Sequence, residues 1–395
     1  MHSAVHRCLS YGSLYNCGML FRLRSSWLAI CLLPIATIVS FTAVYNGSQP
    51  IDAKQVFEEE DVYIAAETVS HHFRGAVLVG MDGKVVFEKG YGSADEEWDV
   101  PNTPTTKFRI ASLTKQFTAA CILLLQERGL LNVQEPISKY LSGLPDAWGA
   151  VTIHELLTHT SGVPNPDYRS ERYAQVQRIG STPQDLVALV RNQPLDFKPG
   201  TKWNYSNTGY VLLGMLIEKQ SGQSYADFLK RNIFQPLAMA NSGYDREADI
   251  LKGRASGYQI EDGHLRNADF IDMSTPFSAG GIYSTVEDMY RWNETLAYPG
   301  KLLSAGSLKQ MFTEYPEATY QGQHYGYGVV ISRQKFGKLL YYHGGGVEGF
   351  SSSIQRYPEE RVSIVVLSNL ATFKPWDLGD HIAAEIFHQP LPSVH

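Results

Sequence analysis

Ser112 and Lys115 have the side chains that nucleophilic catalysis needs, and they lie three residues apart at the start of a helix-periodic apolar stretch, 113–126. Residues at this spacing share one face of a helix, so the hydroxyl and the amine would be neighbours. A neutral lysine there could accept the serine proton during acyl transfer. A free lysine titrates near ~10.4, so burial or a nearby cation must lower its pKa. The alternative for an isolated Ser-x-x-Lys is a helix cap followed by a solvated lysine.

Two further groups have matching chemistry. Tyr205 and Asn207 form the single Tyr-x-Asn of the chain, in a loop before a helix. The tyrosine could relay a proton with Lys115, and the asparagine could hold a substrate amide or the lysine; alternatively, Asn207 caps the helix and Tyr205 packs.

His343 is followed by Gly344, Gly345 and Gly346 between two expected strands. Glycines there allow close approach of a ligand and free a main-chain N–H for an oxyanion; the alternative is an ordinary glycine-rich turn with a surface histidine.

Other patterns are excluded as active sites. Ser332 and Lys335 also match Ser-x-x-Lys, but at a strand end, where positions i and i+3 face opposite ways. His154 and His159 are five residues apart and diverge around a helix, so they are not expected to bind zinc. The chain contains no Gly-x-Ser-x-Gly, no Gly-x-Gly-x-x-Gly and no Walker motif. We therefore expect no metal and no cofactor.

The elements that must position these residues come in three blocks. A helix over 55–72 and a hairpin, 75–81 with 84–89 around Asp82-Gly83, precede the Ser112 helix, which Gly129 ends. Helices and loops dominate 130–310, with helices expected at 183–192, 208–220 and 224–234, and a capping box of Ser284 and Glu287 before a helix reaching 296. Strands at 327–332, 338–342, 351–356 and 361–367 and a helix at 375–387 follow. This order predicts an α+β fold: one antiparallel sheet from both chain ends, covered by the terminal helices, with a mostly helical insertion (about 130–310) alongside and Ser112 at the junction.

The first 50 residues resemble a targeting segment. Residues 27–45 are almost wholly apolar and follow Arg22 and Arg24. If translation starts at Met19, these arginines form the short basic region that precedes the apolar region of a signal peptide. We expect export to the periplasm or the outside, with 1–50 either a cleaved signal peptide or a membrane anchor formed by 27–45, and 51–395 the catalytic domain.

The charge of the chain limits its possible binding partners, and its cysteine content limits its possible disulfides. The net charge is −6, and the arginines of the first 45 residues leave −9 on the rest, which argues against nucleic acid and anionic membrane surfaces. Cys121 alone lies outside the leader, so no disulfide framework is expected; on its apolar helix face it should belong to the core.

Taken together and in this order, Ser112-x-x-Lys115, Tyr205-x-Asn207 and His343-Gly344-Gly345 resemble the motifs of the class C β-lactamase and DD-peptidase group of penicillin-recognising serine hydrolases, which family VIII esterases share. Stretches 154–162, 197–214 and 279–285 are also similar, and the resemblance covers about 55–390. It implies a β-lactamase/transpeptidase-like fold, with Ser112 as the acylated nucleophile and Lys115 and Tyr205 sharing the base and acid roles. It also implies that Asn207 binds the substrate amide, that His343 to Gly345 line the cleft, and that the N–H groups of Ser112 and Gly346 form the oxyanion hole.

One departure bears on the substrate. Class C β-lactamases have Lys-Thr-Gly where this chain has His343-Gly344-Gly345, which lacks the hydroxyl and the permanent cation, so efficient β-lactam hydrolysis is not expected. The candidate substrates are cell-wall D-alanyl peptides, other D-amino-acid peptides, small esters and β-lactams. A non-catalytic binder of peptidoglycan or β-lactams is the alternative, although such a protein would be free to lose one of the four polar motif residues. We expect loops 163–180 and 244–275 to shape the pocket.

Overall fold

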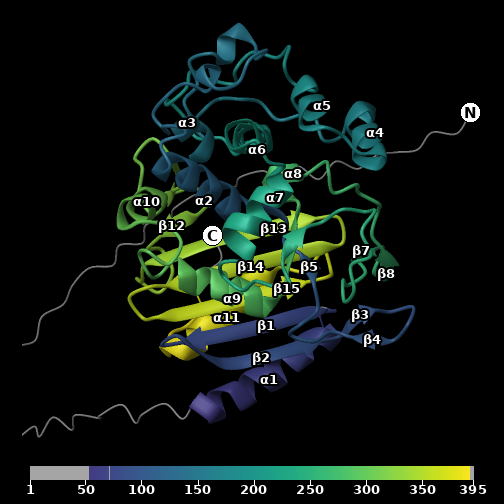
Figure 1. Ribbon diagram of the computed structural model, residues 1–395. Coiled ribbons are helices and arrows are strands. Elements are labelled where there is room, and N and C mark those ends of the chain that lie inside the picture. Colours follow the sequence, from purple (N-terminus) through teal and green to yellow (C-terminus); the bar gives the residue numbers. More distant parts are fainter. Residues whose placement is uncertain (1–52, 71, 392–395) are drawn as a thin grey trace, which may run out of the picture. The chain divides into compact units, whose positions relative to one another are not determined.

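A computed structural model of the chain describes residues 53–70 and 72–391; the expectations for residues 1–50 lie outside these ranges. At its centre is an eight-stranded antiparallel sheet in the order β10-β11-β12-β13-β14-β15-β1-β2 (Figure 1). Strand β1 pairs with β15, Gly75 opposite Ser368 and Met81 opposite Val362, so the first hairpin joins strands from the other end of the chain. The expected α+β fold with one sheet from both chain ends is confirmed. The strands are β1 (Gly75–Met81), β2 (Lys84–Tyr91), β10 (Thr319–Tyr320), β11 (Gln323–Tyr325), β12 (Val330–Ser332), β13 (Leu340–Val347), β14 (Phe350–Tyr357) and β15 (Val362–Ser368).

Successive side chains of a strand point to opposite faces of the sheet, so the hydrophobic core forms two layers. Val77 and Val79 of β1 belong to the cluster formed with α1 (Ala53–Ser70) and α11 (Pro375–Phe387). Ala76 and Leu78 point the other way, into the larger cluster that contains α2 (Thr114–Glu127) and α9 (Val286–Thr295). This two-residue period is the one expected of a strand buried on both faces. The terminal helices therefore cover one face of the sheet, and α2 lies on the other (Figure 1).

The middle of the chain is mostly helical. Its helices are α3 (Ile153–Leu157), α4 (Glu171–Ile179), α5 (Pro183–Ala188), α6 (Asn207–Ser221), α7 (Tyr225–Leu229), α8 (Phe277–Gly280) and α10 (Ala305–Met311), with a π-helical turn, η4 (Lys230–Phe234), after α7. Short strands accompany them: β3 (Ser93–Asp95) with β4 (Val100–Pro101), β5 (Phe108–Arg109) and β6 (Gly243–Tyr244) with β9 (Ile282–Ser284), and β7 (Tyr258–Glu261) with β8 (His264–Asn267). No helix within 53–70 and 72–391 has the length and apolar character needed to cross a bilayer.

Three expectations about elements were wrong. Ser284 is not a helix cap, because it belongs to β9 and pairs there with Phe108 of β5. Thr285 caps α9 instead, and its hydroxyl accepts a hydrogen bond from the N–H of Asp288 at 3.2 Å. Helix α5 ends at Ala188 rather than 192, and turns continue the chain. Strand β13 does not stop at Tyr342 but runs to Val347, because its glycines pair with the serines of β14, Gly345 opposite Ser352.

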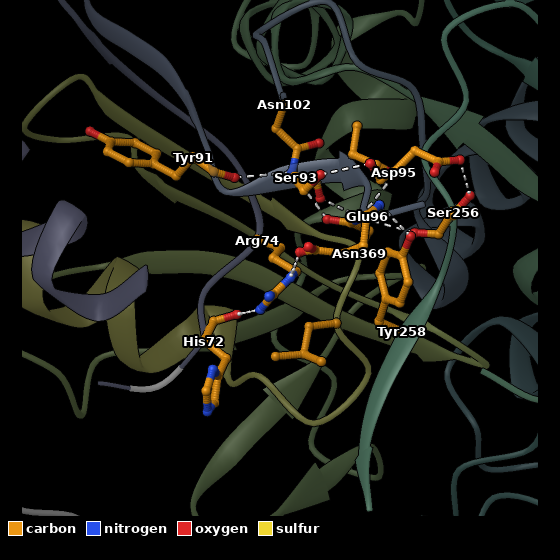
Figure 2. A network of polar contacts seen from close by, with 12 residues as sticks. His72, Arg74, Tyr91, Ser93, Asp95, Glu96, Asn102, Ser256, Tyr258 and Asn369 are labelled. Carbon is orange, nitrogen blue, oxygen red and sulfur yellow. Dashed lines mark hydrogen bonds and ion pairs between the residues drawn. The ribbon is translucent and has the colours of Figure 1, made fainter. Parts of the chain in front are cut away.

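A buried asparagine connects three segments beside the sheet (Figure 2). Asn369, which is fully buried after β15, donates to the carbonyl oxygens of Ser93 (3.1 Å) and Ser256 (2.9 Å). The side-chain oxygen of Asn369 accepts a hydrogen bond from the side-chain amide nitrogen of Asn102 at 3.2 Å. Buried main-chain carbonyls need such donors, because an unsatisfied one costs about 1–3 kcal/mol.

We predict that Asn369→Ala lowers the free energy of unfolding by about 2–4 kcal/mol, because it removes a buried donor from two carbonyls and leaves a small cavity. Urea denaturation followed by circular dichroism measures this loss. Asn267→Ala is the matched control: Asn267 is exposed and donates only to Glu97, so its effect should stay within about 0.5 kcal/mol. Equal losses for the two variants would contradict the assignment of Asn369 as the connecting residue.

Candidate active site

Ser112 lies in a 3-10 turn, η1 (Ala111–Leu113), that leads directly into α2. Two strands hold the residue before this turn: Ile110 accepts from the Ser352 hydroxyl of β14 at 2.8 Å and donates to the carbonyl of Ile282 in β9 at 3.0 Å. Ala111 has φ +47°, a left-handed conformation that costs a non-glycine residue of order 1–3 kcal/mol. Packing against the sheet therefore holds the nucleophile at the rim of a cavity in a conformation that the free chain would disfavour.

Lys115 is completely buried one turn along. Its amine lies 2.8 Å from Asn207 Oδ1, 2.9 Å from the Ala279 carbonyl oxygen and 3.2 Å from Ser112 Oγ. No carboxylate within the described ranges forms an ion pair with it. Burial therefore lowers the pKa of Lys115 well below its usual value, as an unpaired buried amine requires. The alternative of a solvated first-turn lysine is wrong.

The same three contacts determine where the lone pair of a neutral Lys115 amine points. A neutral amine has two N–H groups and one lone pair. The Ala279 carbonyl can only accept, and Asn207 Oδ1 can only accept, so these two atoms take both N–H groups. The lone pair is then left for the Ser112 hydroxyl, which is the geometry of a general base beside its nucleophile.

Tyr205 supplies a second group beside the serine. Burial raises the pKa of its hydroxyl above the usual range, and a hydrogen bond with Ser112 opposes this shift only in part. Its ring centroid lies 4.7 Å from the Lys115 amine. Because the phenol is harder to ionise than usual and the amine is easier to deprotonate, the amine is the better candidate for a base and the phenol for a proton donor.

Asn207 is the first residue of α6, and Ser206, not Asn207, caps that helix by accepting from Gly209 N–H at 3.0 Å. The side chain of Asn207 is therefore free to contact Lys115 through its oxygen. Its amide group donates to the hydroxyl of Tyr168 at 2.9 Å. Tyr168 was not singled out from the sequence; only its position in the 163–180 loop pointed to the pocket.

His343 is buried and uncharged, so the alternative of a surface histidine is wrong. Its Nδ1 lies 2.6 Å from the Gly344 carbonyl oxygen, which can only accept, so Nδ1 holds the proton. Nε2 then accepts from the Tyr325 hydroxyl at 2.8 Å. Burial, and then the proximity of Lys115, lower the pKa of His343 to about 4. This position therefore offers no cation at neutral pH.

The glycines of β13 differ in what surrounds them. A Cβ on Gly345 would lie 2.5 Å from the Ile110 carbonyl oxygen and 3.0 Å from the Ser112 nitrogen, so only glycine lets the strand approach the nucleophile this closely. A Cβ on Gly344 would meet nothing nearer than 3.7 Å, and one on Gly346 would meet nothing within 4 Å. Gly346 lines the same cavity as Ser112.

A cavity of about 120 Å³ opens beside Ser112 and excludes every charged side chain from its lining. The loops expected to shape the pocket contribute to it, as do α5, α6 and the end of β13. The lining residues are Ala111, Ser112, Pro166, Tyr168, Tyr173, Leu186, Leu189, Asn207, Thr208, Val211, Ile271, Thr275, Pro276, Ala279, Gly280, Gly346 and Val347.

His154 and His159 do not form a common site. His154 contacts the Tyr327 hydroxyl at 2.8 Å and the Glu317 carboxylate at 3.0 Å, whereas His159 accepts from the N–H of Ser206. No group of three or more His, Cys, Asp or Glu side chains within 53–70 and 72–391 is placed to hold a metal ion.

Ser112 lies just before a buried helix, beside a lysine without a carboxylate partner in the described ranges and beside the glycines of β13. This arrangement is that of a serine hydrolase. The chain belongs to the Beta-lactamase family, whose profile matches residues 55–386. It is 32% identical over 339 residues to Penicillin-binding protein 4* of Bacillus subtilis strain 168, covering 81% of this chain and 74% of that protein.

Solved structures are similar as well. The octameric penicillin-binding protein homologue from Pyrococcus abyssi matches with a TM-score of 0.75 and 30% identity, over 85% of this chain and 78% of that one. A D-stereospecific amidohydrolase from Streptomyces sp. matches with a TM-score of 0.70 and 25% identity, over 84% of this chain and 99% of that one. The β-lactamase-like fold expected from the motifs is confirmed.

Because Lys115 must be neutral to act as base, we predict that kcat/KM falls as the pH drops through its lowered pKa, with a midpoint far below the ~10.4 of a free lysine. The pH dependence of nitrophenyl acetate hydrolysis measures this midpoint. Lys115→Arg keeps a long cationic side chain that cannot deprotonate, so it should be inactive across the same pH range. An activity that continues to rise beyond pH ~10 would contradict a lysine base with a lowered pKa.

Proposed function

We propose that this protein cleaves a small amide or ester bond through an acyl-enzyme on Ser112, in the manner of a DD-peptidase or a D-amino-acid amidase. The observation on which this proposal depends is the buried Lys115 amine, whose two N–H groups have acceptors and whose lone pair is left for the serine hydroxyl. The similarity to a D-stereospecific amidohydrolase supports amide chemistry.

The proposed reaction has two halves. Ser112 Oγ attacks the substrate carbonyl carbon while its proton passes to Lys115, and the N–H groups of Ser112 and Gly346 stabilise the oxyanion. Tyr205 donates a proton to the leaving nitrogen or oxygen as the carbonyl re-forms, and Lys115 returns its proton to Tyr205. A water molecule then attacks the ester on Ser112 with the same groups, releasing the acid and restoring the hydroxyl.

The cavity supports an uncharged, apolar acyl group. Neither Tyr205, the proposed proton donor, nor His343 lines it, and because a leaving group must meet the proton donor, we assign the cavity to the acyl group. Leu186, Val211 and Ile271 form apolar walls, and a volume of 120 Å³ is slightly below the ~150 Å³ of a cavity that binds benzene. No charged side chain in the lining would compensate a carboxylate. A neutral acyl group therefore fits this cavity better than an acyl group that carries a carboxylate.

We predict that Ser112→Ala abolishes both ester hydrolysis and covalent labelling while the protein stays folded, because no other group can form the acyl-enzyme. Intact-protein mass spectrometry after exposure to a nitrophenyl ester, and separately to benzylpenicillin, measures the labelling. Ser332→Ala is the matched control, since Ser332 begins the other Ser-x-x-Lys and accepts from Gln334 N–H at a strand end. Undiminished hydrolysis by folded Ser112→Ala protein would falsify the mechanism.

The acyl preference gives a separate test. We predict that kcat/KM for isobutyryl esters exceeds that for succinyl esters by at least about tenfold, because the succinyl carboxylate would lose its hydration in an uncharged cavity. Ile271→Ala enlarges the cavity and should raise the ratio of phenylacetyl to acetyl ester turnover by roughly tenfold.

The ratio within one variant is independent of its active fraction, so partial unfolding does not disturb this measurement. Ile250→Ala removes the same atoms from a side chain that is 95% exposed, and it should leave the ratio unchanged. A succinyl preference in the wild-type protein would contradict the proposed acyl site.

We also propose that the protein acts outside the cytoplasm, as a periplasmic, secreted or membrane-anchored enzyme. The apolar segment 27–45 behind Arg22 and Arg24 supports this proposal. Expression with the full leader, followed by fractionation and N-terminal sequencing, separates a cleaved signal from a retained anchor.

A further inference from the structure

Tyr205 and Asn207 flank a stretch of backbone that needs partners from elsewhere. They lie at the N-terminus of α6, where the first N–H groups have no acceptor within the helix. Three successive polar groups are involved: the Tyr205 carbonyl oxygen, the Ser206 N–H and the Asn207 N–H. All three are bonded to side chains of one segment, 159–165, which follows α3.

Asn165 holds two of these groups at once. Its amide nitrogen donates to the Tyr205 carbonyl oxygen at 2.7 Å, and its amide oxygen accepts from the Asn207 N–H at 2.8 Å. A planar side chain with a donor and an acceptor at fixed separation therefore sets the distance between two backbone groups, one in each proposed catalytic residue.

His159 holds the residue between them. Its Nδ1 accepts from the Ser206 N–H at 3.1 Å, and its fully buried ring packs 4.3 Å from the ring of Tyr205 and 4.6 Å from that of Tyr325. Its Nε2 is buried without a hydrogen-bond partner in the described part of the chain. The ring therefore contacts the catalytic tyrosine from behind while it fixes the adjoining backbone.

We propose that His159 and Asn165 are positioning residues for the reaction: they fix Tyr205 against Ser112 and Asn207 against Lys115. This inference rests on the proposed function. Neither residue lines the cavity, so each acts through the residue it holds. Displacing Asn207 would remove one of the two acceptors that turn the Lys115 lone pair toward Ser112. Displacements of about 1 Å in such an arrangement cost up to about a hundredfold in rate.

The first experiment compares kcat and KM for nitrophenyl acetate in Asn165→Ala, His159→Leu and His159→Asn, each normalised to its folded fraction. We expect kcat to fall about ten- to a hundredfold in Asn165→Ala and His159→Leu, with KM changed less than threefold. His159→Asn should recover a large part of kcat, because the oxygen of asparagine can take the place of Nδ1 and accept from Ser206. His159 has φ +61°, a conformation that asparagine tolerates better than leucine, so the two variants are compared only after kcat is normalised to the folded fraction.

His154→Asn is the matched control. His154 is a buried histidine of the same segment, but it contacts Tyr327 and Glu317 rather than 205–207. Removal of the ring lowers the stability of this variant, yet its kcat per folded molecule should stay within twofold of the wild type. Folded Asn165→Ala and His159→Leu proteins with kcat within twofold of the wild type would overturn the proposal, as would a His159→Asn protein no better than His159→Leu.

A crystal structure of Asn165→Ala gives a readout that is independent of turnover. A shift of Tyr205 or Asn207 by about 1 Å or more from Ser112 and Lys115 supports the positioning role, and an unmoved pair contradicts it. If the wild-type protein neither hydrolyses esters nor forms an adduct on Ser112, the proposed function fails, and this structural comparison still decides whether His159 and Asn165 hold the motif.

Discussion

The burial of one unpaired amine is the constraint on which the rest of the site depends. Lys115 has no carboxylate partner among the residues that the structure describes, and it is the second residue of α2, where the positive end of the helix dipole further disfavours a cation. A buried ammonium in this place would be very costly, so the folded protein favours the neutral amine. The acceptors that orient it come from α6 and α8, and the fold has to bring these helices to the start of α2 to make a base of this lysine.

The nucleophile imposes a second constraint, which concerns space. Strand β13 can approach η1 only because Gly345 lacks a side chain, and β14 fixes the same turn through the bond from Ser352 to the Ile110 carbonyl. The strained conformation of Ala111 is thus maintained from the sheet side, while Lys115 is buried from the helical side. Ser112 lies where these two parts meet, so its position depends on the packing of the whole domain rather than on local propensity.

Much of this arrangement could be predicted from the sequence. Hydrophobic period and turn residues identified the first hairpin, the terminal strands and α11, and the three motifs identified residues that the structure brings together around Ser112 and in β13. Local rules failed where long-range pairing decided the outcome: Ser284 became a strand residue by pairing with Phe108, and β13 continued through its glycines by pairing with β14. The contributions of Tyr168, His159 and Asn165 were missed because their contacts with 205–207 cross about 40 residues of chain and have no local pattern.

Burial favours the uncharged forms of the groups around Ser112. It lowers the pKa of Lys115 and of His343 and raises the pKa of Tyr205, and no charged side chain lines the cavity. In the proposed reaction, the attack of Ser112 on a carbonyl would create an ammonium on Lys115 and a negative charge on the substrate oxygen at the same time. In a medium of low dielectric constant these opposite charges attract strongly, whereas water would screen them. Creating both charges at a buried site is nevertheless costly unless each one is stabilised by nearby dipoles, so the proposed mechanism needs the Asn207 and Ala279 oxygens at the Lys115 amine and N–H groups at the substrate oxygen.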